Sequence, residues 1–235
     1  MRKILFLLLF LICSIASRAQ IDTAFWFAAP DISSDFGYDQ PIQVVVTAFQ
    51  QPCTVSISIP ANISITPQII NLPANTTQIV DLTSWLSVLE CAPGDAVLNK
   101  GLKIVSDNKI SAYYSVSAGG PNPDFFSLKG INALGTGFYI SSQYILDNSP
   151  EYSPAAISSF NIVATQDNTQ VTITPSNNIV GHPAGSAFTI TLNRGQTYAA
   201  IAASQLAANH LQGSSVSATK PIAITLADDL LNGGV

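Results

Sequence analysis

Hydrophobic and polar side chains alternate along most of the chain, which is the pattern of strands buried on one face. Residues 54–59 alternate hydroxyl side chains with valine and isoleucine, and residues 170–174 and 188–192 alternate in a similar way. A period of two residues turns one set of side chains toward a core and the other toward water. Turn-forming pairs such as Asp107-Asn108 and Asp167-Asn168 separate the runs. The pattern predicts an all-β fold.

Helical spacing is convincing at one place in the sequence. Residues 81–90 (DLTSWLSVLE) are the best candidate, because their apolar side chains recur three or four positions apart and Asp81 or Thr83 is placed to cap the first turn. Residues 203–210 are a weaker second candidate. The fold is therefore expected to hold at most one or two short helices.

The order of short segments in the first half of the chain returns in the second half. Four pairs of segments match, at offsets of 113, 116, 120 and 112 residues: 23–27 with 136–140, 54–57 with 170–173, 70–72 with 190–192, and 110–112 with 222–224. A fixed period indicates repeated structural units, and about seven short strands in each suit a sandwich. We predict two tandem β-sandwich-like repeats, residues 20–128 and 129–235. We expect the second to be truncated at its C-terminal end and the polypeptide to continue beyond it.

The N-terminus has the features of a secretory signal peptide. Arg2 and Lys3 precede an apolar run over residues 4–13, and Ser17 and Ala19 place small residues at the cleavage positions. We expect cleavage between Ala19 and Gln20, and a protein that is secreted or held at the cell surface. The apolar run is too short for a transmembrane helix, so no transmembrane segment is predicted.

The charge of the remaining chain limits its partners. Removal of Arg2, Lys3 and Arg18 leaves six basic and 14 acidic residues, a net charge of −8. Nucleic acids and anionic membranes are bound through basic surfaces, so an acidic, lysine-poor chain is not expected to bind either. The sequence contains no phosphate-binding loop and no dinucleotide fingerprint, and no cofactor is predicted.

Two cysteines, Cys53 and Cys91, remain after cleavage. An even count in an oxidising compartment favours a disulfide, which would close a loop of 38 residues. By the chain-entropy relation such a bond would contribute about 3–4 kcal/mol. The alternative is two buried free thiols, and the sequence leaves both readings open.

Signals for catalysis are few. The two histidines are His182, within a Gly-His-Pro turn, and His210, near the end of the second helix candidate. A catalytic serine or cysteine needs a base and an orienting acid, and no Gly-x-Ser-x-Gly elbow is present. We therefore expect both histidines to be structural or exposed, and we predict that the protein is not an enzyme.

The acidic residues offer one weak metal candidate. Asp31, Asp35 and Asp39 lie four positions apart in a loop-like stretch, and their oxygens are of the kind that calcium accepts. The spacing matches no established calcium loop, and a solvated loop is the favoured interpretation. The pair Asp228-Asp229 is ambiguous in the same way. A hydrolase that uses loop aspartates is the least favoured function.

Aromatic residues cluster at the start of each predicted repeat. Residues 25–27 are Phe-Trp-Phe, and residues 138–139 are Phe-Tyr at the matching place. Such a cluster suggests stacking on a carbohydrate. Recurrence at equivalent positions favours a role in the core instead.

The residues also carry a resemblance to a known family. The segments concerned are 23–30, 100–107, 133–139, 164–175 and, most strongly, 182–198 (HPAGSAFTITLNRGQTY). In this order they resemble the N-terminal domain family of IgGFc-binding proteins, found in exported bacterial proteins and in an animal mucus protein. Asp22 and Ala24 depart from the family pattern. The resemblance implies an extracellular β-rich binding module, and it carries no binding residue across.

Three functions follow from these observations. The first is an exported, non-catalytic adhesion or recognition module for a glycoprotein, a glycan or an immunoglobulin-like partner. The second is a structural spacer that presents other domains of a larger surface protein. The third is the hydrolase already described.

Overall fold

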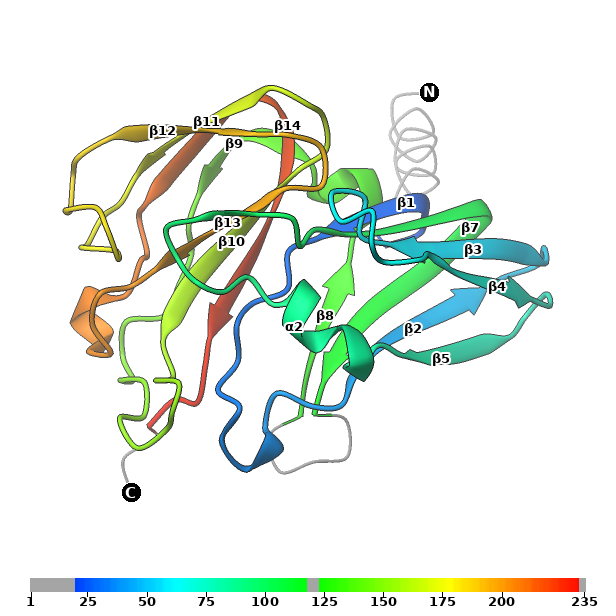
Figure 1. Cartoon of the computed structure of the whole chain (residues 1–235), viewed down its shortest axis with the longest axis horizontal. Coiled ribbons are helices and arrows are strands. Elements are labelled where there is room, and N and C mark those ends of the chain that lie inside the picture. The colour runs from blue at the N-terminus through cyan, green and yellow to red at the C-terminus, as the bar shows by residue number, and fades with distance from the viewer. Residues whose placement is uncertain (1–19, 118–122, 233–235) are drawn as a thin grey trace, which may run out of the picture.

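The computed structural model describes residues 20–117 and 123–232. The predicted signal peptide lies outside the described residues, as do residues 119–122 of the glycine- and proline-rich segment 119–123. The described chain forms two antiparallel sheets, which lie side by side in Figure 1, and the all-β prediction is confirmed. No helix in these two ranges is long and apolar enough to cross a membrane.

The first sheet is built around one long strand, β7. Its strands are β1 (Asp22–Phe27), β2 (Ile42–Ala48), β3 (Cys53–Ser58), β4 (Gln68–Leu72), β5 (Thr77–Asp81), β7 (Leu102–Val116) and β8 (Asp124–Leu128). The order is β4-β3-β7-β2-β5. The first half of β7 pairs with β3 and β1, and its second half pairs with β2 and β8. The sheet thereby wraps around a single core that includes Phe25, Ile57 and Tyr114.

The second sheet is built in the same way around β14. Its strands are β6 (Val97–Leu98), β9 (Gly135–Tyr139), β10 (Ser158–Ala164), β11 (Thr169–Thr174), β12 (Phe188–Leu192), β13 (Thr197–Ile201) and β14 (Ser215–Asp228). The order is β12-β11-β14-β10-β13-β6, and β9 also pairs with β14. Phe160, Ile173 and Tyr198 belong to its core.

Corresponding strands of the two sheets pair in the same register. Ile57 lies opposite Ile104, and Ile173 opposite Val216, so β3–β7 and β11–β14 match residue for residue at the offsets found in the sequence. Pairing of β1 with β7 and of β9 with β14 also matches, including a shift of register at the same point. Among the described residues, β8 has no counterpart in the second sheet. It pairs with the second half of β7, and no described strand pairs with β14 at the corresponding place.

The period-two pattern describes the burial of the central strands. Val55 and Ile57 of β3 are fully buried, as are Val171 and Ile173 of β11. The intervening hydroxyl side chains are exposed or half-buried, because neighbouring side chains of a strand point to opposite faces. The two strands have the same burial pattern along their length.

The helices are shorter than the sequence predicts. Residues 81–90 contain a 3-10 turn, η2 (Thr83–Trp85), followed by one helical turn, α2 (Leu86–Leu89). The Asp81 carboxylate accepts a hydrogen bond from the Thr83 backbone N–H at 2.8 Å, but the N-cap position of this turn is Leu82, so neither Asp81 nor Thr83 occupies it. Residues 203–210 form only the 3-10 turn η4 (Ala207–Asn209). Two further 3-10 turns are η1 (Asp35–Gly37) and η3 (Gly130–Ala133).

The two sheets are joined by a buried interface and by a shared strand pairing. Val163, Ala199 and Ala223 of the second sheet form an apolar cluster with Ala28 and Cys91 from the first half of the chain. The short strand β6, which the sequence places in the first repeat, pairs with β13 of the second sheet. Both faces of β10 are therefore buried, one in its own core and one against the first half of the chain.

Candidate functional site

A groove separates strand β8 of the first sheet from the second half of β14. Its wider part is a hollow of about 530 Å³. The side chains that line it are mainly aromatic or aliphatic, and among them are Trp26, Phe125, Phe126, Phe138, Ile224 and Leu226. Phe125 is 70% exposed, which is unusual for a ring of this size. An exposed apolar groove of this kind is typical of a surface that binds another molecule.

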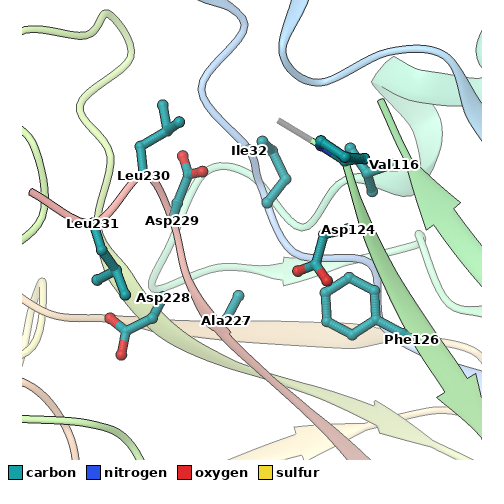
Figure 2. A pocket seen from close by; sticks show the side chains of 10 residues that line it. Ile32, Val116, Asp124, Phe126, Ala227, Asp228, Asp229, Leu230 and Leu231 are labelled. Atoms are coloured by element: carbon teal, nitrogen blue, oxygen red, sulfur yellow. The ribbon is translucent and has the colours of Figure 1, made fainter. Parts of the chain in front are cut away.

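The groove continues past the ends of the same strands into an acidic hollow of about 350 Å³. Figure 2 shows Asp124 of β8 on one side of this hollow and Asp228 and Asp229 on the other, with Ile32 between them. Phe126 lines both hollows. The groove is therefore apolar along its length and negatively charged at one end.

Further carboxyl groups lie behind the acidic end, between the two sheets. Asp229 is buried, and its Oδ2 accepts a hydrogen bond from the Ser33 backbone N–H at 2.8 Å. Glu90 Oε1 accepts one from the Ile32 N–H at 3.4 Å. Asp39 is also buried, and its Oδ1 has no hydrogen-bond partner in the part of the chain that the structure describes. The end of β14 and two loops from the first half of the chain thus bring a group of acids together.

Burial raises the pKa values of these acids. Loss of hydration raises the pKa of Glu90 to about 8, and the nearby charges of Asp31 and Asp39 raise it in the same direction. Burial likewise raises the pKa of Asp229 to about 6. The pKa of Asp31 is raised chiefly by burial, against the opposing charge of Lys100.

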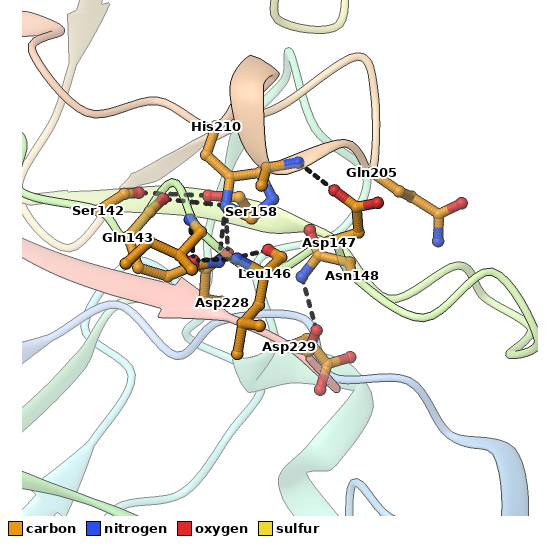
Figure 3. A network of polar contacts seen from close by, with 12 residues as sticks. Ser142, Gln143, Leu146, Asp147, Asn148, Ser158, Gln205, His210, Asp228 and Asp229 are labelled. Atoms are coloured by element: carbon orange, nitrogen blue, oxygen red, sulfur yellow. Dashed lines mark hydrogen bonds and ion pairs between the residues drawn. The ribbon is translucent and has the colours of Figure 1, made fainter. Parts of the chain in front are cut away.

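A second polar network fixes the loop that leads from β9 to β10 (Figure 3). His210 is fully buried, and its Nδ1 lies 2.9 Å from Gln143 Nε2 and 3.3 Å from Asp228 Oδ1. Asp147 Oδ1 accepts a hydrogen bond from the Ala207 N–H at 2.7 Å, and Asn148 Nδ2 donates to the Asp229 carbonyl at 2.6 Å. These contacts tie η4, the loop and the end of β14 together, and so hold the acidic end of the groove in place.

The other histidine joins the two halves of the chain. His182 Nε2 lies 3.0 Å from Asp95 Oδ1, and the His182 ring is stacked on Phe188 with 3.4 Å between ring centroids. The Tyr198 hydroxyl donates to the same Asp95 oxygen at 2.8 Å. Asp95 precedes β6, so this cluster fastens that segment to the second sheet.

Neither histidine is arranged for nucleophilic catalysis. The polar partners of His210 are Gln143 and Asp228, and that of His182 is Asp95. Within the described ranges, no serine hydroxyl or cysteine thiol hydrogen-bonds to either ring, as a nucleophile and base would require. Both rings have structural partners, in keeping with the sequence interpretation.

The calcium candidate does not form a coordination group. The Asp35 carboxylate accepts a hydrogen bond from the Ser153 N–H at 2.6 Å, whereas Asp39 is buried and Asp31 lies near Lys100. Among residues 20–117 and 123–232, no three His, Cys, Asp or Glu side chains are placed to hold a metal ion. At the sheet junction the structure brings Asp31 and Asp39 near Glu90, and Asp31 near Asp229, although Glu90 and Asp229 come from distant parts of the sequence.

The two cysteines are free and buried in the structure, which corresponds to the second of the two readings that the sequence left open. Cys53 belongs to the core of the first sheet, whereas Cys91 lies in the apolar cluster between the sheets. Because strand β3 turns the Cys53 side chain into its own core, the two thiols belong to different packing layers. Burial raises the pKa of the Cys91 thiol to about 12 and so keeps it protonated.

The aromatic clusters divide between core and surface. Phe25 and Phe27 are buried in the first core, as the sequence interpretation expects. The Trp26 ring is half-buried, with Lys103 Nζ 5.0 Å and the Arg194 guanidinium 6.0 Å from its centroid. Tyr139, by contrast, is 85% exposed, so the core interpretation is wrong for that residue.

The sequence did not reveal the groove. Its two walls are strands about 100 positions apart, and they face each other only because the sheets pack through β10 and β6. The exposed ring of Phe125 interrupts the alternation in Asp124–Leu128, where two phenylalanines stand side by side. That local break was the one available signal.

A comparison with protein families supports a binding role. Residues 125–231, from β8 to beyond β14, match the family model described as IgGFc binding protein. The resemblance found in the sequence is confirmed over that range. No curated protein and no solved structure matches the chain. The matched family is one of binding domains rather than a known catalytic family, and the match does not identify the partner.

Proposed function

We propose that this chain is an exported binding module that recognises an extracellular protein through the groove between β8 and β14. The single observation that carries the proposal is the groove itself, with the exposed Phe125 ring and further aromatic side chains along it. Aromatic side chains supply much contact area at low entropic cost, and they are enriched where proteins bind partners. The family match supports binding in general.

The charge of the groove favours a partner with a basic segment. Asp124, Asp228 and Asp229 line the acidic hollow, so a lysine or arginine placed there would gain charge-assisted hydrogen bonds. The same charges disfavour nucleic acid, which carries a negative backbone. We therefore propose a glycoprotein or an immunoglobulin-like protein as the partner in preference to a free glycan.

The proposal places the protein outside the cell. Residues 1–19 would direct export, and the chain would act as a secreted or cell-surface protein after cleavage between Ala19 and Gln20. Only 10% of the sequence is charged, so its polar surface depends largely on uncharged side chains, which suits this setting.

A binding screen with groove variants tests the proposal. Residues 20–235 are immobilised and exposed to mucins, immunoglobulin Fc and a glycan array. A partner found in this way should bind Phe125→Ala at least about tenfold more weakly, because a central aromatic contact is worth about 1.4 kcal/mol or more. The matched control is Tyr139→Ala, at a ring that is even more exposed and lines neither hollow. If both variants weaken binding equally, or if neither weakens it, the groove is not the binding site.

The alternative function is a structural spacer, and a specific observation favours it. The sheets are fastened by the β6–β13 pairing and by the cluster of Asp95, His182 and Tyr198, which would suit a rigid element within a larger surface protein. A spacer would show no saturable binding in the same screen. A partner that binds wild type and loses affinity for Phe125→Ala would exclude it as the sole role.

A further inference from the structure

Within the described chain, one edge of the second half of β14 is unpaired, whereas the corresponding edge of β7 is paired with β8. Residues 112–116 of β7 pair with β2 on one side and with β8 on the other. Residues 223–228 of β14 pair with β10 on one side, and no strand of the described residues pairs with them on the other. The two long strands otherwise have corresponding neighbours in the same register. The pairing of β8 with β7 therefore shows which kind of strand could pair with the open edge of β14.

The direction of the backbone groups shows which amides face the open edge. The Asp229 N–H donates to the Ile157 carbonyl, on the β10 side, at 3.4 Å. Because successive amides of a strand point to opposite sides, those of Ile224, Leu226 and Asp228 point away from β10. In β7 the Ser117 N–H donates to the Pro41 carbonyl on the β2 side at 2.9 Å. By the same alternation, the amides of residues 112, 114 and 116, which correspond to 224, 226 and 228, point toward β8.

There is room for a strand beside these groups. The hollow of about 530 Å³ is bounded on this side by residues 223–226 and on the other by residues 125–129. Ile224 and Leu226 pack against the core of the second sheet but are only half-buried, so part of each side chain stays exposed. An unpaired edge with partly covered apolar side chains is a template for strand addition.

We propose that the open edge of β14 binds an extended strand of the partner protein. This strand would lie antiparallel to β14, in the place that corresponds to that of β8 on β7. The proposal rests on the proposed function, since it specifies how the partner of the same groove is held. Main-chain hydrogen bonds to residues 224, 226 and 228 would supply affinity, and alternate side chains would supply specificity.

The register of β8 predicts the sequence that fits. Leu128 and Phe126 lie opposite Ala112 and Tyr114 of β7, the counterparts of Ile224 and Leu226, so the partner needs apolar side chains at these two positions. Opposite Asp228 it needs a basic side chain, because Asp124 and Asp229 line the same hollow. In its own N-to-C direction the strand therefore has the pattern basic, any, apolar, any, apolar.

Amide hydrogen exchange with a designed peptide tests this directly. The probe is a synthetic peptide of residues 123–129 that carries Asp124→Lys, added to the isotope-labelled chain 20–235. In the free monomer the amides of Ile224, Leu226 and Asp228 should exchange rapidly, and saturating peptide should slow them at least about tenfold. The amides of residues 223 and 225 face β10 and should be slow in both states. The peptide without the Asp124→Lys change should bind more weakly.

Three results would overturn the proposal. One is that the three amides are already protected in the free chain, by self-association or by another segment. Another is that the peptide binds without slowing them. The third is that the peptide fails to bind at all.

A pair of variants separates this proposal from the proposed function. Leu226→Pro removes the N–H that faces the open edge but no hydrogen bond to β10, and proline is tolerated at such edge positions. Leu226→Ile keeps the amide and serves as the control. Both should fold, and only Leu226→Pro should lose the peptide and the partner from the screen. A partner that depends on Phe125 but binds Leu226→Pro as tightly as wild type would leave the proposed function standing and refute strand addition.

Discussion

Glu90 is a residue whose ionisation is coupled to the fold. It lies between the sheets with Asp31 and Asp39 nearby, and its pKa is raised from 4.5 to about 8. A folded-state pKa above the unfolded one means that the folded protein binds more protons between these values. The stability that Glu90 contributes is therefore complete below about pH 4.5 and is lost as the pH rises through about 8.

The corresponding prediction compares the two glutamates of the chain. Wild type should lose thermal stability between pH 5 and pH 9, and Glu90→Gln should flatten this dependence because the amide stays neutral. The control is Glu151→Gln, at an exposed position. Thermal unfolding followed by circular dichroism across this pH range is the measurement. A dependence unchanged by Glu90→Gln would show that Glu90 ionises freely in the folded protein.

The cysteines give a second prediction at the scale of single residues. Both thiols are buried, and the pKa of Cys91 is raised to about 12, so neither should react with a thiol reagent in the native protein. Unfolding in denaturant without reductant should expose two thiols per chain. A count of zero by titration with a chromogenic thiol reagent would mean that Cys53 and Cys91 are bonded after all.

At the scale of elements, β3 and β11 should respond alike to mutation. Ile57 and Ile173 are fully buried at corresponding points of the two strands. Replacement of either by alanine should cost about 2–5 kcal/mol, the usual loss for a large buried aliphatic side chain. Ser56→Ala and Thr172→Ala, on the opposite faces of the strands, should cost far less, within about 0.5 kcal/mol. Chemical denaturation of the four variants provides the comparison, and a large cost at only one isoleucine would contradict the equivalence of the strands.

At the scale of the whole molecule, the Asp95 cluster should couple the two halves of the chain. Asp95→Ala would leave the buried Tyr198 hydroxyl without its acceptor and would remove the partner of His182. An unsatisfied buried hydroxyl costs about 1–3 kcal/mol, so Asp95→Ala should lower the free energy of unfolding by that amount. In a double-mutant cycle with Tyr198→Phe the two losses should not add, because both remove the same hydrogen bond. Strict additivity would show that the contact contributes nothing to stability.

The sequence by itself determined the strands and their burial. Alternation of hydroxyl and β-branched residues at 54–59 and 170–174 fixed which side chains turn inward, because a strand has only two faces and the period of the pattern selects one of them. The matched order of segments also anticipated the common strand order of the two sheets. The helical spacing of residues 81–90 correctly predicted helical structure there, but the segment forms only a 3-10 turn followed by one helical turn.

Only the tertiary structure decided what lies between the sheets. The placement of β6 in the second sheet, the separation of Cys53 from Cys91 and the gathering of Glu90 with Asp229 all depend on how two complete sheets pack. The groove has the same origin, since Phe125 and Leu226 come from strands that never pair. Local patterns report the environment of a residue along its own strand, whereas contacts between sheets arise from surfaces that distant segments build together.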